Sequence, residues 1–320
     1  MKEVLTDANF PRDAEGHTYH VATKLGQVAN RIITVGDHVR ARRIAELFDG
    51  GKAIFEKSSQ RLFLTLTGTY KGTPITVVAI GMGFSAVDFF LRECRAVVQG
   101  EMIVVRLGSC GSIDESLRIG TVVVPFQSVG VTRNWDYFSP ELSGKERSAL
   151  EPYLITQPIA CDKEVHDALL KSLEASTVAP ARSDVFGGEK AKAVGNTTNA
   201  SADSFYAAQG RNDPAFSDAN DTLIDDLKKR RPGVATFEME TYALSSLAAC
   251  ANADGSGRIR TGAVQMIFAD RNSSGVITPT EVELLELWAG KSVCDALISL
   301  PIPEELTQKE GVWSQASTSS

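Results

Sequence analysis

Short apolar segments, each the length of one buried strand, alternate along this chain of 320 residues with segments of helical periodicity. The first unit is a predicted strand at 31–35 (RIITV), a turn at Gly36 and Asp37, and a predicted helix at 39–48. Leucines alternate with Phe and Thr at 62–67, and this segment with 75–80 predicts a β-hairpin. Strands that alternate with helices form a parallel or mixed sheet covered on both faces.

The rest of the chain continues this alternation, so we expect one α/β domain built as a three-layer α/β/α sandwich around a mixed central sheet. A composition of 43% hydrophobic residues is sufficient for a large core. Further strands are predicted at 102–107, 121–131, 234–237 and 263–268, and helices at 85–99, 218–230, 240–251 and 281–299.

The predicted domain occupies residues 19–300, with an N-terminal extension at 1–18. Proline-punctuated residues 139–158 and Ala-, Gly-, Thr- and Asn-rich residues 178–201 are expected to be loop insertions. The polar end of the chain, 301–320, is expected to be a flexible tail.

Charge and cysteine content exclude several classes of protein. A net charge of −7 argues against nucleic-acid and membrane-surface partners, because both are polyanions that favour basic patches. No segment is apolar over the 18 or so residues that a membrane helix needs. Five scattered cysteines and four histidines form neither a disulfide framework nor a metal-binding spacing. We expect a cytoplasmic protein without a metal centre.

A glycine-rich turn, GMGFSA at 81–86, follows a predicted strand and opens a predicted helix. It fits the G-x-G-x-x-A pattern of a dinucleotide-binding turn, so an NADP-dependent oxidoreductase is one hypothesis. In that fold the next strand ends in an acidic residue that binds ribose, whereas here it ends in Arg106 and Leu107.

A second candidate site is the loop that Arg106 opens, because its small residues can present backbone N–H groups to an anion. Ser109 adds a hydroxyl, and the guanidinium of Arg106 adds a permanent forked charge. Taken alone, such an arginine is more often paired with a core carboxylate. Arg40 and Arg61 stand at other predicted ends of strands, however, and together the three arginines indicate a phosphate site.

Two further motifs have the chemistry to hold a nucleoside. Glu238 and Glu240 flank Met239 where a strand gives way to a helix, and a carboxylate there can accept both hydroxyls of a ribose diol; favourable interaction with the helix dipole is the structural alternative. The segment 203–211 carries an aromatic pair, a glutamine and an arginine. An aromatic face can stack a base, while Gln209 and its neighbour Arg211 match the edge of a pyrimidine with two carbonyls and one N–H.

In this order, the motifs resemble the nucleoside phosphorylase family of uridine phosphorylases and hexameric purine nucleoside phosphorylases. The resemblance covers residues 20–299 and is closer to the uridine phosphorylases, because purine enzymes lack the F-Y-x-x-Q-x-R segment. It rests on GDHVRARRIAELFD (36–49), GMGFSA (81–86), VVRLGSCGSIDESLRIGTVVVP (104–125), DSFYAAQGR (203–211) and FEMET (237–241).

The resemblance implies a pentosyltransferase that cleaves uridine with phosphate and needs no organic cofactor. The implied phosphate ligands are Gly36, Arg40, Arg106, Ser109 and, from a neighbouring subunit, Arg61. The implied ribose ligands are Met239, Glu240 and the neighbour's His20. The implied uracil ligands are Phe205, Gln209 and Arg211. Arg106, Gln209, Arg211 and Glu240 would then be the catalytic residues, in a homodimer with shared sites.

Alternatives within the family remain because the sequence departs from the uridine phosphorylase pattern. Asp270 resembles the acid of purine enzymes, which favours a purine nucleoside phosphorylase or a nucleosidase. We expect Asp270 instead to bind a cation or backbone donors and to be structural, because its charge would repel a developing uracil anion. Leu62 replaces the acidic residue that helps to hold a monovalent cation. A protein that binds nucleosides without turnover is a further alternative.

Overall fold

The computed structural model describes residues 5–176 and 191–314, and in this part of the chain every strand joins one twelve-stranded sheet. The strands are β1 (Arg31–Val35), β2 (Phe55–Ser58), β3 (Leu64–Tyr70), β4 (Thr73–Ala79), β5 (Met102–Ser112), β6 (Val122–Arg133), β7 (Tyr153–Ile155), β8 (Ile159–Ala160), β9 (Ala193–Ala202), β10 (Val234–Glu238), β11 (Ile259–Asp270) and β12 (Gly275–Val276). The α-helices are α1 (His38–Ala45), α2 (Phe84–Arg95), α3 (Gly144–Arg147), α4 (Lys163–Ala175), α5 (Leu223–Arg230), α6 (Thr241–Asn252) and α7 (Pro279–Ser299).

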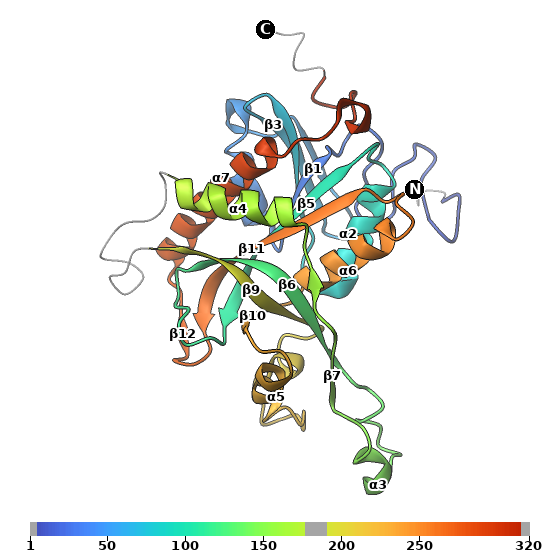
Figure 1. The fold of residues 1–320 in the computed structure, drawn as a ribbon. Coiled ribbons are helices and arrows are strands. Elements are labelled where there is room, and N and C mark those ends of the chain that lie inside the picture. The colour runs from blue at the N-terminus through green and yellow to red at the C-terminus, as the bar shows by residue number, and fades with distance from the viewer. Residues whose placement is uncertain (1–4, 177–190, 315–320) are drawn as a thin grey trace.

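The sheet is mixed and partly closed. Its order is β12-β11-β6-β9-β10-β5-β1-β4-β3-β2, with β7 and β8 paired to β6. Strands β4, β1, β5 and β11 run parallel, whereas β3 and β4 form the predicted antiparallel hairpin. Because β11 also pairs with β5, the strands β5, β11, β6, β9 and β10 close into a ring (Figure 1).

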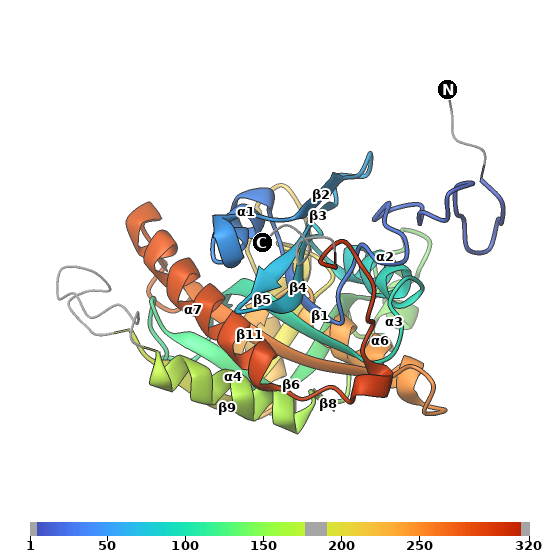
Figure 2. The same cartoon turned by 90° about the horizontal axis from the view of Figure 1, so that it is seen from above.

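Two helical layers cover the faces of the sheet that β1, β4 and β5 build. Helices α1, α4 and α7 pack on one face, and α2 and α6 pack on the other (Figures 1 and 2). Alternation along each strand explains this arrangement, since successive side chains point to opposite faces. In β1, Ile33 packs with the first layer and Ile32 with the second; in β5, Val105 and Val104 divide in the same way.

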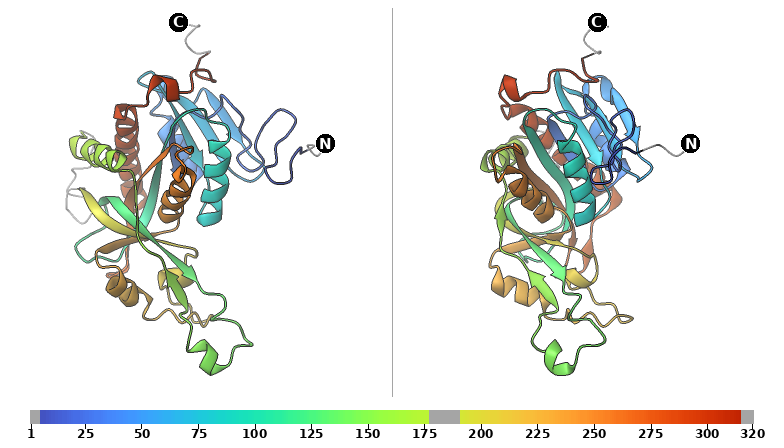
Figure 3. Two further views of the ribbon diagram at one scale, coloured as in Figure 1. Left: turned by 45° about the vertical axis from the view of Figure 1, so that its right-hand side comes forward. Right: turned by 90° about the vertical axis from the view of Figure 1, so that its right-hand side faces the viewer.

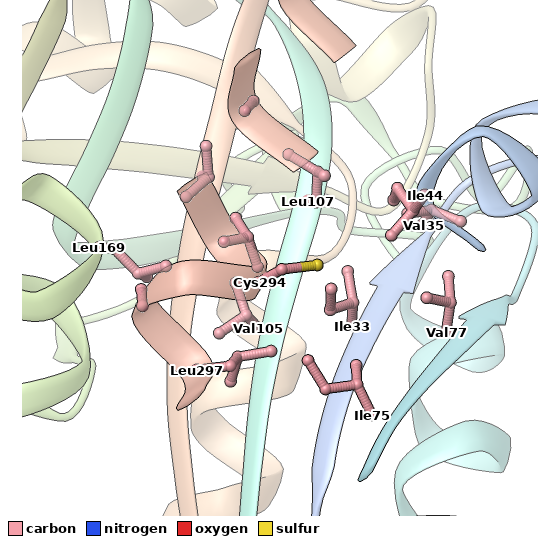
Figure 4. Close-up of a cluster of buried hydrophobic side chains, with 14 of the residues drawn as sticks. Ile33, Val35, Ile44, Ile75, Val77, Val105, Leu107, Leu169, Cys294 and Leu297 are labelled. Atoms are coloured by element: carbon pink, nitrogen blue, oxygen red, sulfur yellow. The ribbon is translucent and has the colours of Figure 1, made fainter. Parts of the chain in front are cut away.

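The core under α7 illustrates the packing (Figure 4). Ile33 of β1 and Val105 of β5 lie beside Cys294 and Leu297 of α7, all of them fully buried. Helix α7 begins with a capping box at Thr278, as its sequence pattern suggests.

Among the described residues, no helix has both the length and the hydropathy to span a membrane. All five cysteines are free. The predicted α/β sandwich with a mixed sheet is confirmed.

Part of the molecule projects away from the layered region (Figure 3). It includes residues 139–158, which were expected to form a loop and do not. That segment contains α3 and also β7, which pairs antiparallel with the far end of β6. The side chain of Tyr153 in β7 is buried in a separate cluster with residues of β6, β9 and α5. The prolines therefore punctuate a paired excursion of the sheet.

The expectation of a loop at 178–201 is wrong where it can be assessed. Residues 193–202 form β9, which lies between β6 and β10 in the sheet, while 177–190 lie outside the described residues. The strand was missed because its sequence, AVGNTTNASA, is small and polar instead of apolar. Its polar side chains are buried because they have hydrogen-bond partners at the neighbouring strand β10.

The expected flexible tail at 301–320 is also corrected, because 301–314 pack against the domain. The buried side chain of Gln308 accepts a hydrogen bond from the Gln99 backbone N–H at 2.9 Å, and the backbone N–H of Gln308 donates to Oδ1 of Asn30 at 2.8 Å. Trp313 is only 9% exposed. Polar composition concealed these contacts, and residues 315–320 lie outside the described part of the chain.

We expect Gln308→Ala to lower the free energy of unfolding by about 1–3 kcal/mol, because it leaves the Gln99 N–H without its acceptor. The exposed Glu305, three residues away, provides the matched control Glu305→Ala, for which we expect less than about 0.5 kcal/mol. Urea unfolding followed by tryptophan fluorescence measures both. Equal stability of the two variants would mean that the segment is frayed in solution.

Candidate active site

A cavity of about 390 Å³ lies where β1, β4, β5, β10 and β11 end or lead into turns. Parallel strands bring their carboxyl ends to one edge of a sheet, and ligands commonly bind there. The cavity is lined by Gly36, Asp37, Arg40, Met82, Arg106, Ser109, Cys110, Gly111, Phe205, Gln209, Arg211, Phe237, Glu238, Met239, Glu240, Phe268, Ala269 and Val276.

Nine of the eleven residues predicted as ligands line this cavity, although they come from segments far apart in the sequence. They are Gly36, Arg40, Arg106, Ser109, Phe205, Gln209, Arg211, Met239 and Glu240. The two that do not line it are His20 and Arg61, which the sequence analysis assigns to the site of a neighbouring subunit.

The buried guanidinium of Arg106 organises one end of the cavity. Arg106 has the same strand parity as Val104, so it points to the face covered by α2 and α6. There its Nη2 donates to Oε2 of Glu240 at 2.7 Å, with both side chains about 5% exposed. Its Nε and Nη1 have no hydrogen-bond partner among the described residues, although both atoms are buried. Buried donors of this kind require a partner, and an anion would satisfy them.

A second arginine stands beside the first. Asp37 caps α1 by accepting the Arg40 N–H at 2.9 Å, which explains why the turn after β1 places Arg40 in the cavity wall. The Nε of Arg40 donates to Glu286 at 2.8 Å, and its guanidinium lies over the ring of Phe268. Glu286 therefore holds Arg40 in place, and the sequence analysis missed this contact from α7.

The glycine-rich turn at 81–86 has a different use from the one its pattern suggests. The Gly83 N–H, which would face a pyrophosphate, donates to Oε1 of Glu240 at 2.6 Å. Gly83 has φ of 93°, a conformation that a side chain disfavours. The turn thus binds a protein carboxylate, which removes the argument for an NADP-dependent oxidoreductase.

Glu238 is a buried carboxylate in the cavity wall for which no role was predicted from the sequence. It is 4% exposed and accepts hydrogen bonds from the Glu240 N–H at 2.9 Å and the Thr241 N–H at 3.0 Å, the two donors that open α6. Asn199 and Ser201 of β9 donate to its other oxygen. Burial, and then the charge of Glu240, raises the pKa of Glu238. The groups that hydrogen-bond to Glu238 nevertheless all donate to it. We therefore expect an ionised carboxylate that holds Glu240 against Arg106.

The cavity is also lined by the predicted base ligands, which lie on the turn around the 3-10 helix Ala207–Gln209. Nη1 of Arg211 donates to Oε1 of Gln209 at 2.5 Å, and the guanidinium lies 3.7 Å from the ring centre of Phe205. This contact orients the amide of Gln209. Burial, with Arg271 nearby, lowers the pKa of Arg211 to about 10, so Arg211 stays charged at neutral pH.

Arg271 was not singled out from the sequence. From the end of β11 it donates to the carbonyl oxygens of Gln209 at 3.0 Å and Gly210 at 3.3 Å. It therefore holds the backbone of the turn that carries Gln209. Arg271 does not itself line the cavity, but it lies close enough to Arg211 to add to the effect of burial in lowering the pKa of that guanidinium, and two cations near this turn would favour an anionic ligand electrostatically.

Asp270 behaves as expected. It does not line the cavity; it accepts hydrogen bonds from the Asn272 N–H at 2.9 Å and from the Ser273 hydroxyl at 2.6 Å. Burial raises the pKa of Asp270, but these hydrogen bonds outweigh it and hold the pKa below its ordinary range. The carboxylate closes the turn between β11 and β12.

Covalent catalysis by the cysteine in the cavity is disfavoured. Cys110 is 6% exposed, and burial raises the pKa of its thiol well above the ordinary value. The thiolate is the nucleophilic form of cysteine, and it is therefore scarce here at neutral pH. The polar groups of the cavity are suited to binding and orienting two reactants.

The comparisons with known proteins agree with this geometry. Residues 30–294 match the family model described as the Phosphorylase superfamily. The chain belongs to this superfamily. A uridine phosphorylase from Thermococcus kodakarensis is 32% identical over 276 residues, which cover 85% of this chain and 84% of that protein. A purine nucleoside phosphorylase of the DeoD type from Geobacillus kaustophilus is 36% identical, over 33% of this chain and 43% of that protein.

Solved structures show the same fold. A structure from work on two uridine phosphorylases of the oomycete Phytophthora capsici has a TM-score of 0.84 and 36% identity, covering 93% of this chain and all of that one. A nucleoside phosphorylase of Trypanosoma brucei has a TM-score of 0.72 at 22% identity, with 91% of this chain covered and all of that one, and shows the fold alone. Together the relatives support nucleoside phosphorylase activity, that is, a pentosyltransferase.

We expect Glu238→Gln to reduce kcat/KM for phosphorolysis by about 10²-fold, because an amide N–H₂ must then face other N–H donors and the loop of Glu240 shifts. Glu283→Gln on the surface of α7, where the side chain is 64% exposed, is the matched control and should keep the parent's activity. Steady-state kinetics measure both. Parent-like activity in Glu238→Gln would rule out the positioning role.

Proposed function

We propose that this chain is a uridine phosphorylase, which cleaves uridine with inorganic phosphate to uracil and ribose 1-phosphate. The observation that carries the proposal is one cavity lined both by the Arg106–Glu240 pair and by Gln209 with Arg211. The similarity to the uridine phosphorylases of Thermococcus kodakarensis and Phytophthora capsici supports it.

The phosphate end accounts for the nucleophile. The free Nε and Nη1 of Arg106 would donate to two oxygens of phosphate, with Arg40 and the Ser109 hydroxyl beside them. Gly36 lies close to the same guanidinium: a Cβ atom added at Gly36 would be 3.6 Å from Nη2 of Arg106. Phosphate held there is positioned to attack C1′ of the ribose, and such positioning converts a reaction of two substrates into an effectively unimolecular one.

The ribose and the base follow from the remaining groups. Glu240, fixed by Gly83 and Arg106, would accept the hydroxyls of the ribose diol, with Met239 beside it. As the glycosidic bond breaks, negative charge builds on the departing uracil. The N–H groups of Gln209 and the guanidinium of Arg211 would stabilise that charge, a contribution on the order of 10²–10³ in rate for one well-placed donor.

Uracil is favoured over a purine because Asp270, the carboxylate that resembles the acid of purine enzymes, does not line the cavity. A purine leaving group can be protonated on N7 by an acid, whereas Asp270 is occupied by its own turn. The reaction proposed here transfers the ribosyl group directly to phosphate. It requires neither an organic cofactor nor a metal ion.

We further propose a homodimer whose two sites are shared. Arg61 lies outside its own cavity and contacts Tyr19 through a hydrogen bond and a stacked cation, 4.7 Å from the ring centre. His20 stacks on Phe89 nearby. Exposed apolar side chains surround both, among them Leu62 at 76% exposure, and an interface between two chains would cover them.

A nucleoside panel assayed with and without phosphate tests the substrate. We expect uridine to be cleaved only with phosphate, and to be preferred over cytidine by about 10⁴ in kcat/KM, because cytosine leaves donors of the site unpaired.

Two variants test the roles of individual residues. Gln209→Leu should reduce uridine turnover and leave phosphate binding nearly unchanged, while Asp270→Asn should keep the rate of uridine phosphorolysis within about tenfold of the parent. A higher kcat/KM for inosine, lost in Asp270→Asn, would make the enzyme a purine nucleoside phosphorylase.

Subunit mixing tests the shared site. Arg61→Ala and Arg106→Ala should each be nearly inactive, but a hybrid dimer contains one intact site, because its Arg106 and its donated Arg61 come from different chains. After random exchange of equal amounts, we expect activity to return to about a quarter of the parent's. Exchange that is verified by mass but restores no activity would refute the sharing of sites.

A further inference from the structure

Glu93 of α2 is a buried carboxylate that the proposed reaction leaves unexplained. It is 6% exposed, and its helix neighbours Phe90 and Cys94 belong to the apolar core. A carboxylate buried among apolar side chains is costly unless hydrogen bonds compensate it. The partners of Glu93 lie 72 and 73 residues away, in the segment that leads into the domain.

All the hydrogen bonds of this carboxylate go to His20 and Val21. Oε2 accepts the Val21 N–H at 2.7 Å, and Oε1 accepts the His20 N–H at 2.9 Å. Oε1 also contacts Nδ1 of the His20 ring at 2.6 Å. The backbone contacts alone would anchor the segment, so the ring contact is an additional feature.

The ring contact determines which nitrogen of His20 carries the proton. An ionised carboxylate only accepts hydrogen bonds, so Nδ1 must be the donor and, in the neutral ring, Nε2 is left as an acceptor. Nε2 has no hydrogen-bond partner in the part of the chain that the structure describes. The ring is stacked on Phe89 with 3.9 Å between centroids and meets Tyr19 edge to face, and its plane is thereby fixed.

We propose that Glu93 is a positioning residue that makes Nε2 of His20 a hydrogen-bond acceptor for the group on C5′ of the nucleoside in the partner's site. This inference rests on the proposed function, in which His20 reaches across the dimer. The side chain of His20 is 23% exposed, so a second chain can reach part of the ring. The carboxylate behind the ring also favours a cationic donor over an anionic group at C5′.

Glu93→Gln tests the tautomer with little change of shape. The new amide can keep its oxygen at the position of Oε2, which already accepts both the Val21 N–H at 2.7 Å and the His20 N–H at 3.0 Å, while its N–H₂ group faces Nδ1. Nδ1 then becomes the acceptor and the proton moves to Nε2. The segment stays anchored, whereas the atom that faces the substrate changes from an acceptor to a donor.

Three substrates report this change at pH 8: uridine, 5′-deoxyuridine and 5′-amino-5′-deoxyuridine, whose ammonium group can only donate. In the parent we expect a higher kcat/KM for the amino compound than for the deoxy compound. In Glu93→Gln we expect this ratio to fall at least tenfold, because a donor now faces a donor. Uridine should lose less, since its hydroxyl can donate or accept.

Two variants serve as controls. Asp49 also accepts two backbone N–H groups, those of Lys71 and Gly72, away from the cavity, so Asp49→Asn should leave the substrate ratio unchanged. His20→Ala should abolish discrimination between uridine and 5′-deoxyuridine. A decrease of kcat/KM in Glu93→Gln that is equal for all three substrates would show that Glu93 only anchors the segment. Parent-like discrimination in His20→Ala would instead refute the role of His20 in the shared site.

Discussion

The buried ion pair between Arg106 and Glu240 is the contact on which the rest of the cavity depends. Removing either partner leaves an uncompensated buried charge, which typically costs about 3–5 kcal/mol. Each partner also has a second role, since Glu240 accepts a hydrogen bond from the turn at Gly83, and two nitrogens of Arg106, Nε and Nη1, have no partner among the described residues. One pair thus joins the proposed phosphate and ribose ligands into one rigid unit.

This pair exists because of the closed arrangement of strands. Strand β5 pairs in parallel with both β1 and β11, which places Arg106 beside Thr34 of β1 and Ala263 of β11. Strand β10 pairs with β5 farther along, at Gly111 and Ser112, and the residues after its end place Glu240 at the start of α6. Strand β9 supplies the polar side chains that satisfy Glu238 and so hold the start of α6. Strand β9 is therefore polar because its side chains position the carboxylate of Glu238.

Much of this could be predicted from the sequence, and the failures have physical causes. Strands such as β1 and β5 are apolar and of strand length, so their periodicity reveals them. Strand β9 is polar because it serves Glu238, and such a strand resembles a loop until its partner is known. The contacts of Glu93 and Glu286 join segments 72 or more residues apart, which local patterns do not reveal. The nine ligands that line the cavity could be predicted because several motifs occur in the same order as in the nucleoside phosphorylase family.

The most direct test of the account is a crystal structure with phosphate bound. We expect phosphate oxygens within hydrogen-bond distance of both Nε and Nη1 of Arg106, while Nη2 continues to donate to Glu240. Arg40 and Ser109 should contact the same anion. A phosphate bound elsewhere, or an Arg106 that leaves Glu240 to reach it, would contradict the central claim that this pair positions the nucleophile and the ribose together.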